Sequence, residues 1–158
     1  MLARLSTVMH GSVLAAGPLC SHLSQVMTPA IFGCSGLELS ADERAFFREA
    51  DPAGYILFKR NCESPDQLRR LTDSLREIHG RDRLLISIDQ EGGRVARLGP
   101  PEWRKWPAPA RFGELYERAP ASAIEAMRLN SEAMATELAE AGITVDFHAP
   151  CDVARPET

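Results

Sequence analysis

The residues best suited to chemistry form one short segment, Asp89-Gln-Glu-Gly-Gly-Arg-Val-Ala-Arg97, directly after an apolar run. An aspartate in such a place can accept hydrogen bonds from adjacent hydroxyl groups of a sugar, and an arginine offers a planar fork of donors to oxygen atoms. The two glycines let the backbone approach a ligand closely. We therefore expect Asp89 and Arg97 to bind a ligand that is rich in hydroxyl groups.

Glu91 and Arg94 lie in the same segment but suit a different role. Ion pairs that only support the local structure are common beside binding sites. We expect Glu91 and Arg94 to form a buried ion pair that holds the loop, and we assign ligand contact to Asp89 instead.

A second group of potential ligands consists of Asp146, His148 and Asp152. Carboxylate oxygens and imidazole nitrogens bind metal ions, and two residues that are two apart on a strand point to the same face. This spacing does not guarantee a third ligand, so we predict neither a metal site nor a cofactor.

Two further sets of residues are less informative. Lys59 and Arg60 follow an apolar run and face either a ligand or solvent, and the sequence does not decide between them. Trp103 and Trp106 are interleaved with basic residues, a pattern also found where bases stack on aromatic side chains. The acidic composition opposes a nucleic-acid partner, so we expect these tryptophans to pack within a loop.

The elements that must position these residues alternate between short apolar runs and amphipathic stretches, which is typical of βα units around a parallel sheet. The apolar runs predict four strands, over residues 29–34, 55–58, 84–88 and 143–147. The stretches between them predict three helices, over residues 40–50, 64–80 and 121–141.

Local signals support these helices. Ser40 and Glu43 match a capping box, in which each side chain accepts a hydrogen bond from the other residue's backbone N–H. Ser64 is followed by Pro65, which combines an N-cap with a proline at the first helical position. The third helix ends at Gly142, and its expected apolar face consists of Ile124, Met127, Met134, Leu138 and Ala141.

Polar residues follow every predicted strand, at 33–36, 59–61, 89–91 and 146–152. Ligands of parallel α/β folds bind where the carboxyl ends of the strands meet. Four strands with three intervening helices match about the first half of a (β/α)8 TIM-type barrel, which typically needs about 250 residues. A doubly wound phosphate-binding domain would need a glycine-rich loop after the first strand, and residues 33–36 are too short for one.

The composition excludes several classes of partner. A net charge of -4 opposes binding to a phosphate backbone, because that binding requires a surplus of basic residues. No apolar run approaches the roughly 18 residues that a membrane-spanning helix needs. The four cysteines are never closer than 14 residues, which matches no redox or zinc motif. We expect a cytoplasmic protein with reduced thiols.

The first 26 residues differ from the rest. They contain one early arginine and a broken apolar stretch, so a weak secretory signal is conceivable, but glycine, proline and polar residues interrupt it. We expect residues 1–26 to be an N-terminal extension and residues 27–158 to form one structural unit.

The chain resembles β-N-acetylhexosaminidases of glycoside hydrolase family 3, through nearly all of residues 28–155. The matching pieces are Gly54-Tyr-Ile-Leu-Phe-Lys-Arg-Asn61, Ile88-Asp-Gln-Glu-Gly-Gly-Arg-Val-Ala-Arg97, the Trp106-Pro-Ala-Pro stretch, and Gly142-Ile-Thr-Val-Asp-Phe-His-Ala-Pro-Cys-Asp-Val153. The resemblance implies an enzyme that removes terminal non-reducing β-linked N-acetylglucosamine from peptidoglycan fragments. By the same resemblance, Asp89 binds sugar hydroxyls and Arg97 contributes to the same pocket, whereas His148 has no family role.

The resemblance also implies what these residues do not include. Members of the family use an aspartate nucleophile on a late strand and a His-Asp pair on a mobile loop, and we find neither motif in the 158 residues. We therefore predict no catalytic residue within this chain, and a muropeptide-binding protein that is a monomer at full length. The alternative hypothesis is a non-catalytic sugar-binding or assembly module.

Overall fold

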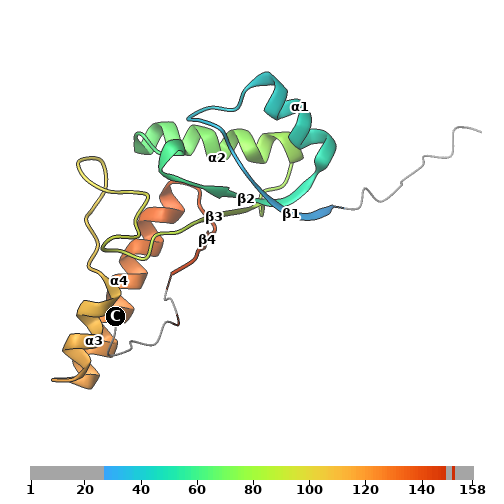
Figure 1. Cartoon of the computed structure of the whole chain (residues 1–158). Helices are drawn as coiled ribbons and strands as arrows, with labels where there is room; N and C mark the ends of the chain where they lie inside the picture. Colours follow the sequence, from blue (N-terminus) through green and yellow to red (C-terminus); the bar gives the residue numbers. More distant parts are fainter. Residues whose placement is uncertain (1–26, 149–150, 152–158) are drawn as a thin grey trace, which may run out of the picture.

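A computed structural model describes residues 27–148 and residue 151. Four strands and four α-helices alternate along the chain, together with one short 3-10 helix (Figure 1). In chain order the elements are β1 (Thr28–Gly33), α1 (Ala41–Ala50), β2 (Pro52–Leu57), η1 (Lys59–Asn61), α2 (Pro65–His79), β3 (Leu85–Ile88), α3 (Pro109–Tyr116), α4 (Pro120–Glu140) and β4 (Val145–Asp146).

The four strands form one parallel sheet in the order β1-β2-β3-β4. The register pairs Tyr55 with Ile86 and Leu57 with Ile88, so these side chains share one face of the sheet. The α/β class and the parallel sheet that the sequence predicts are confirmed, and each strand lies within three residues of its predicted start and end.

The capping signals are confirmed. The Ser40 side chain accepts a hydrogen bond from Glu43 N, and Glu43 accepts one from Ser40 N. Ser64 caps α2 in the same way through Gln67 N. Asp51 ends α1 in the left-handed conformation, and its carbonyl accepts a hydrogen bond from Thr28 N at 2.8 Å. Pairing with β1 therefore starts β2 at Pro52, earlier than its apolar run predicts.

One face of the sheet packs against α1 and α2, which lie together on one side of the strands (Figure 1). The core on this side is built around Phe47, whose ring contacts that of Tyr55 edge-on at 4.9 Å between centroids. The remaining buried side chains there are aliphatic: Leu57, Leu68, Leu71, Leu75, Ile86 and Ile88. These two helices and the sheet form a continuous core that holds the strand ends in place.

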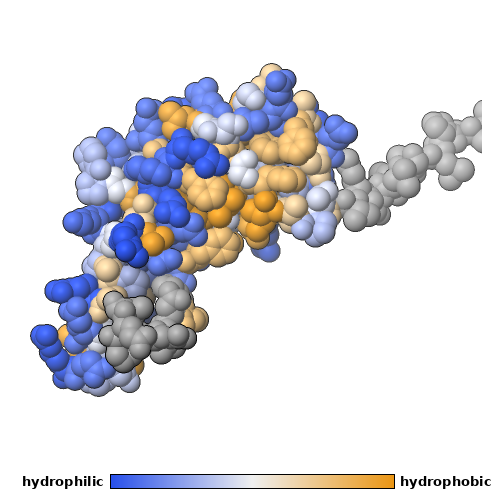
Figure 2. All heavy atoms as spheres, in the orientation of Figure 1, coloured by the Kyte–Doolittle hydropathy of each residue, from blue (hydrophilic) through white to orange (hydrophobic). Residues whose placement is uncertain are grey.

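The opposite face of the sheet is less covered. Ile31 of β1 is 45% exposed, although it lies in the middle of its strand. Figure 2 shows apolar residues gathered at the surface over the strands. The part of the chain that the structure describes therefore leaves an apolar sheet surface open.

Helix α3 was not predicted. Its first residue is Pro109, and a proline at the first helical position needs no hydrogen-bond partner. Helices α3 and α4 pack side by side and extend away from the sheet (Figure 1).

The geometry of α4 corrects its predicted apolar face. Met134, Leu138 and Ala141 are buried as expected, but Ile124 is 62% exposed. The first half of α4 runs beside α3 and beyond the sheet (Figure 1). Ile124 lines a pocket there together with Phe112 and Tyr116 of α3, away from the core of the sheet.

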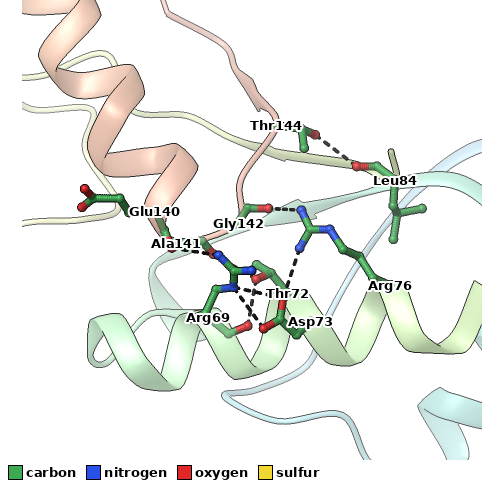
Figure 3. A network of polar contacts seen from close by, with 9 residues as sticks. All are labelled: Arg69, Thr72, Asp73, Arg76, Leu84, Glu140, Ala141, Gly142 and Thr144. Carbon is green, nitrogen blue, oxygen red and sulfur yellow. Dashed lines mark hydrogen bonds and ion pairs between the residues drawn. The ribbon is translucent and has the colours of Figure 1, made fainter. Parts of the chain in front are cut away.

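A polar network joins α2 to the end of α4 (Figure 3). Thr72 donates to Ala141 O at 2.9 Å, Arg69 donates to Glu140 O at 3.3 Å, and Arg76 donates to Gly142 O. These bonds satisfy carbonyl groups that a helix leaves without partners at its C-terminus. Gly142 ends the helix as predicted, with a φ of 81°.

The helices α1 to α4 include none that combines the length and the apolar character needed to cross a membrane, within the described residues.

Candidate functional site

The carboxyl ends of the strands carry the predicted polar residues to one edge of the sheet. Because all strand pairs are parallel, η1 after β2, the Asp89 segment after β3 and His148 after β4 leave the sheet at this same edge. The fold thus places residues that are up to 89 positions apart, from Lys59 to His148, after strand ends on the same side of the sheet.

Asp89 and Arg97 form an ion pair. Arg97 Nη2 lies 2.8 Å from Asp89 Oδ2, and both side chains are about one-quarter exposed, at 26% and 27%. Among the described residues, Asp89 Oδ1 accepts no hydrogen bond from protein, and Arg97 Nε is buried without a partner. The two predicted site residues are therefore neighbours, and each keeps an unused polar atom.

Gln90 positions this pair, and sequence reasoning missed it. Its side chain is fully buried, and its Oε1 accepts hydrogen bonds from Arg97 N at 2.8 Å and Leu98 N at 3.0 Å. Its Nε2 donates to Leu98 O at 2.9 Å. A buried amide between two charged neighbours gives little signal in one sequence, because Gln is usually a surface residue.

The two glycines of the segment lie close to another part of the chain. Gly92 and Gly93 both have positive φ angles, 90° and 61°. A Cβ at Gly92 would collide with Pro107 O, and one at Gly93 would collide with Ala108. Gly93 N also donates to Trp106 O at 3.0 Å. The glycines therefore permit close contact with the following loop of the chain itself.

The predicted ion pair between Glu91 and Arg94 is wrong. Arg94 is exposed, and no salt bridge joins it to Glu91 within the segments that the structure describes. The sharp turn at Gly92 and Gly93 holds the loop through backbone contacts, so no ion pair is needed there.

Asp146 joins the Asp89 segment from β4. Its Oδ1 accepts a hydrogen bond from Gln90 N at 2.9 Å. Burial raises the pKa of Asp146, and the nearby carboxylates of Asp89 and Glu91 raise it further, against the lowering effects of the Gln90 hydrogen bond and His148. A carboxylate with a raised pKa among other carboxylates is typical of a functional site.

His148 points elsewhere. Its Nε2 lies 3.1 Å from the Ser131 hydroxyl on α4, whereas Asp146 contacts Gln90. Asp152, the third residue of the alternative metal site, lies outside the described residues. Over residues 27–148 and 151, no cluster of three candidate metal ligands is present.

The residues after β2 divide into structural and accessible ones. Asn61 is fully buried and donates to Cys34 O and Gly36 O, which ties the end of β1 to that of β2. Arg60 also donates to Cys34 O and packs over the Phe58 ring at 4.6 Å. Arg60 therefore supports the fold, whereas Lys59 is exposed and lines a cavity.

Trp103 and Trp106 are buried, as expected for loop packing. The indole Nε1 of Trp106 donates to Glu137 Oε2 of α4 at 2.8 Å. This bond fixes the loop that follows the Asp89 segment against α4.

Comparisons with known proteins show which family the chain is similar to. Residues 20–158 match the model of the glycosyl hydrolase family 3 N terminal domain. The chain is 38% identical over 130 residues to a β-hexosaminidase of Alkalilimnicola ehrlichii, and 40% identical over 128 residues to one of Thioalkalivibrio sulfidiphilus. These matches cover 82% and 80% of this chain, but only 37% and 36% of the relatives. The chain thus spans little more than a third of their length.

Solved structures show the same similarity. NagZ from Neisseria gonorrhoeae in complex with N-trifluoroacetyl-D-glucosamine aligns with a TM-score of 0.71 and 28% identity, over 78% of this chain and 35% of that one. A family 3 β-N-acetylglucosaminidase from Paenibacillus sp. aligns with a TM-score of 0.60 and 33% identity, over 74% of this chain and 22% of that one. The resemblance stated from the sequence is confirmed, and the chain belongs to the N-terminal domain family of glycosyl hydrolase family 3.

Proposed function

We propose that this chain supplies the sugar-binding part of a β-N-acetylhexosaminidase that removes terminal non-reducing β-linked N-acetylglucosamine from peptidoglycan fragments. The observation that carries the proposal is the Asp89–Arg97 pair at the carboxyl edge of the sheet, with its unused acceptor and donor. The β-hexosaminidase names of the relatives and the glucosamine derivative bound by a similar structure support it.

In this proposal Asp89 accepts hydrogen bonds from sugar hydroxyls through the oxygen that Arg97 leaves unused. Arg97 pairs with this carboxylate through Nη2, and it offers its remaining donors to oxygens of the same sugar. Gln90 fixes the position of Arg97 relative to Asp89, because its side chain accepts hydrogen bonds from the backbone of residues 97 and 98. Asp146 adds a half-buried carboxyl group to the same edge.

The reaction itself requires groups beyond these. A retaining glycosidase needs a carboxylate that attacks the anomeric carbon and an acid that protonates the leaving oxygen, then acts as a base toward water. We propose that these groups lie on strands that complete a (β/α)8 barrel around the open face of this sheet, in a cytoplasmic and monomeric enzyme.

The test uses Asp89→Asn in the intact protein, with Asp82→Asn as the matched control. Asp82 is exposed in the turn before β3, at the opposite end of that strand from Asp89. We expect Asp89→Asn to weaken binding of N-acetylglucosamine by roughly tenfold or more, because a charged acceptor is lost at about 1.5–3 kcal/mol, whereas Asp82→Asn leaves it unchanged. Unchanged affinity in Asp89→Asn contradicts the proposal.

The second candidate function is a non-catalytic sugar-binding or assembly module, which would use the same Asp89–Arg97 pair without the reacting groups. Hydrolysis of a chromogenic β-N-acetylglucosaminide by the 158-residue chain distinguishes the two. Saturable sugar binding without turnover by this chain supports the module, and turnover would show that catalytic groups lie within these residues.

A further inference from the structure

Glu137 of the outer helix α4 binds the loop that follows the Asp89 segment, residues 98–108. Its Oε2 accepts a hydrogen bond from Trp106 Nε1 at 2.8 Å, and its Oε1 accepts one from Arg104 N at 3.3 Å. A carboxylate can serve two N–H donors at once, and hydrogen bonds to a charged acceptor are stronger than neutral ones. Glu137 therefore fastens two points of the loop to one helix.

The part of α4 that carries Glu137 is itself fixed to the fold. Met134 and Leu138, which lie on either side of Glu137 in the sequence, are buried in the core. Beyond them, Thr72 and Arg76 of α2 donate to carbonyl groups at the end of the helix (Figure 3). A side chain on such a rigid element fixes its partners more precisely than a side chain on a loop does. The position of the loop is therefore set by the helix.

Trp106 connects the loop to the turn inside the Asp89 segment. The residue is only 9% exposed, and its carbonyl accepts a hydrogen bond from Gly93 N at 3.0 Å. The next residue, Pro107, lies so close to Gly92 that a Cβ there would collide with its carbonyl oxygen. The loop thus packs directly on this turn, with no space between them for a side chain.

The same turn leads into Arg97. Gly92 N donates to Val95 O at 3.1 Å, which closes the turn two residues before Arg97. The backbone of Arg97 is also bound by Gln90, and its guanidinium group lies 2.8 Å from Asp89. A displacement of the loop at its contact with the turn therefore changes the geometry of the ion pair.

We propose that Glu137 is a positioning residue of the sugar-binding site. It acts through Trp106, and the turn that packs against that residue, on the Asp89–Arg97 pair. Within the described residues Glu137 forms no hydrogen bond with either member of the pair, so its effect is indirect. The inference rests on the proposed function, because it gives Glu137 a role in binding the same sugar.

The test measures binding of N-acetylglucosamine to the intact protein by calorimetry in Glu137→Gln. Glutamine keeps the shape of the side chain but has one acceptor oxygen for two N–H donors, so one of these donors faces an NH2 group. We expect the variant to bind the sugar roughly three- to tenfold more weakly, which is within the range of coupling in one hydrogen-bond network.

Glu140→Gln is the matched control, because it makes the same change on the same helix. Glu140 is exposed, and its side chain points away from the contacts with α2 (Figure 3). This variant should bind the sugar as the wild type does. Equal affinities of the Glu137 and Glu140 variants would overturn the proposal.

A spectroscopic readout separates positioning from a general loss of stability. The 158 residues contain two tryptophans, Trp103 and Trp106, and fluorinated tryptophan makes each one visible by fluorine NMR. Trp106→Phe identifies the Trp106 signal by its disappearance. N-acetylglucosamine should shift this signal in the wild type, and Glu137→Gln should shift it before any sugar is added. A Trp106 signal that saturating sugar leaves unchanged in the wild type contradicts the coupling.

A double-variant cycle tests the path through Trp106. Trp106→Phe removes the indole N–H and keeps an aromatic ring, so we expect it to weaken sugar binding about as much as Glu137→Gln does. The two substitutions together should weaken binding less than the product of their separate effects, because both remove the same hydrogen bond. Effects that simply multiply would mean that Glu137 does not act through Trp106.

Asp89→Asn separates this inference from the proposed function. If Asp89→Asn weakens sugar binding and Glu137→Gln does not, the inference is wrong and the proposed function stands. If neither variant weakens binding, both are wrong. If only Glu137→Gln weakens it, the proposed role of Asp89 is wrong, and so is the path from Glu137 to the ion pair.

Discussion

At the scale of single residues, Gln90 organises the candidate site although it has no charge. Its three side-chain hydrogen bonds, two buried and one partly buried, fix the backbone of Arg97 and Leu98, which places the guanidinium group beside Asp89. A buried amide that loses its partners is costly, because the backbone groups it served remain buried. The geometry of the pair thus depends on a residue that touches neither member's charged group.

We therefore expect Gln90→Ala to lower the free energy of unfolding by about 2–4 kcal/mol, at roughly 1 kcal/mol for each hydrogen bond lost with added cost for the unpaired groups. Denaturant unfolding measures this change. Glu91→Ala is the control, because the neighbouring Glu91 is part of no salt bridge in the described part of the chain and should change stability by less than about 0.5 kcal/mol. Equal effects of the two substitutions would show that Gln90 has no special role.

Asp146 makes stability depend on pH. Its pKa in the folded protein is above the ordinary value of 3.8, so folding favours the protonated form. The favourable contribution is fully present below the ordinary pKa and is lost as pH rises through the folded pKa. Ionised Asp146 therefore opposes folding at neutral pH.

Asp146→Asn removes this ionisation and keeps an oxygen that accepts from Gln90 N. The variant should unfold at a higher temperature than the wild type at neutral pH, and the difference should shrink as the pH falls toward the ordinary carboxyl value. Thermal unfolding of both proteins across this range measures the difference. A difference that is independent of pH would exclude titration of Asp146 as its cause.

At the scale of elements, the contact between α2 and the end of α4 sets where β4 begins. Gly142 leaves the helix with a positive φ, and a Cβ there would collide with the side chains of Thr72 and Arg76 (Figure 3). The close approach lets Thr72 and Arg76 bind the last carbonyls of α4. The chain then enters the sheet beside β3, next to the Asp89 segment.

Gly142→Ala should lower the free energy of unfolding by roughly 1–3 kcal/mol, because it adds a strained backbone conformation and a steric overlap. Gly36→Ala is the matched control, since a Cβ at Gly36 meets no atom within 4 Å and its φ is not positive. Chemical denaturation of the two variants provides the comparison. The explanation fails if Gly142→Ala is no less stable than Gly36→Ala.

At the scale of the whole molecule, the described sheet has two edges and one open face. β1 and β4 are the edge strands, and β4 has only two residues. Backbone groups along an edge lack partners within the sheet, so edge strands open more readily than central ones. An open apolar face and two edges are what half of a barrel would leave for its other half to cover.

Hydrogen exchange of the 158-residue chain should therefore be slower in β2 and β3 than in β1 and β4. In the intact protein, a closed barrel would protect all four strands alike, because closure removes the edges. Exchange measured by mass spectrometry on both forms tests this expectation. Equal protection of the four strands in the 158-residue chain would mean that the half-barrel interpretation is wrong.

The sequence by itself determined much of this protein. Capping residues such as Ser40 and Ser64 and the apolar runs of the strands act locally, so their spacing predicts four strands and three helices. The family was indicated by the resemblance that the Asp89 to Arg97 segment and the other matching pieces carry. The missed helix α3 begins at a proline, which the sequence pattern could not separate from a loop.

Only the tertiary structure decided which groups meet. It paired Arg97 with Asp89 instead of Glu91 with Arg94, turned Gly92 and Gly93 toward the following loop, and left Ile124 exposed. It also joined Glu137 of α4 to Trp106 of that loop. The physical reason is that these contacts depend on how strands and loops distant in sequence pack against one another, which no local pattern of charge or hydropathy specifies.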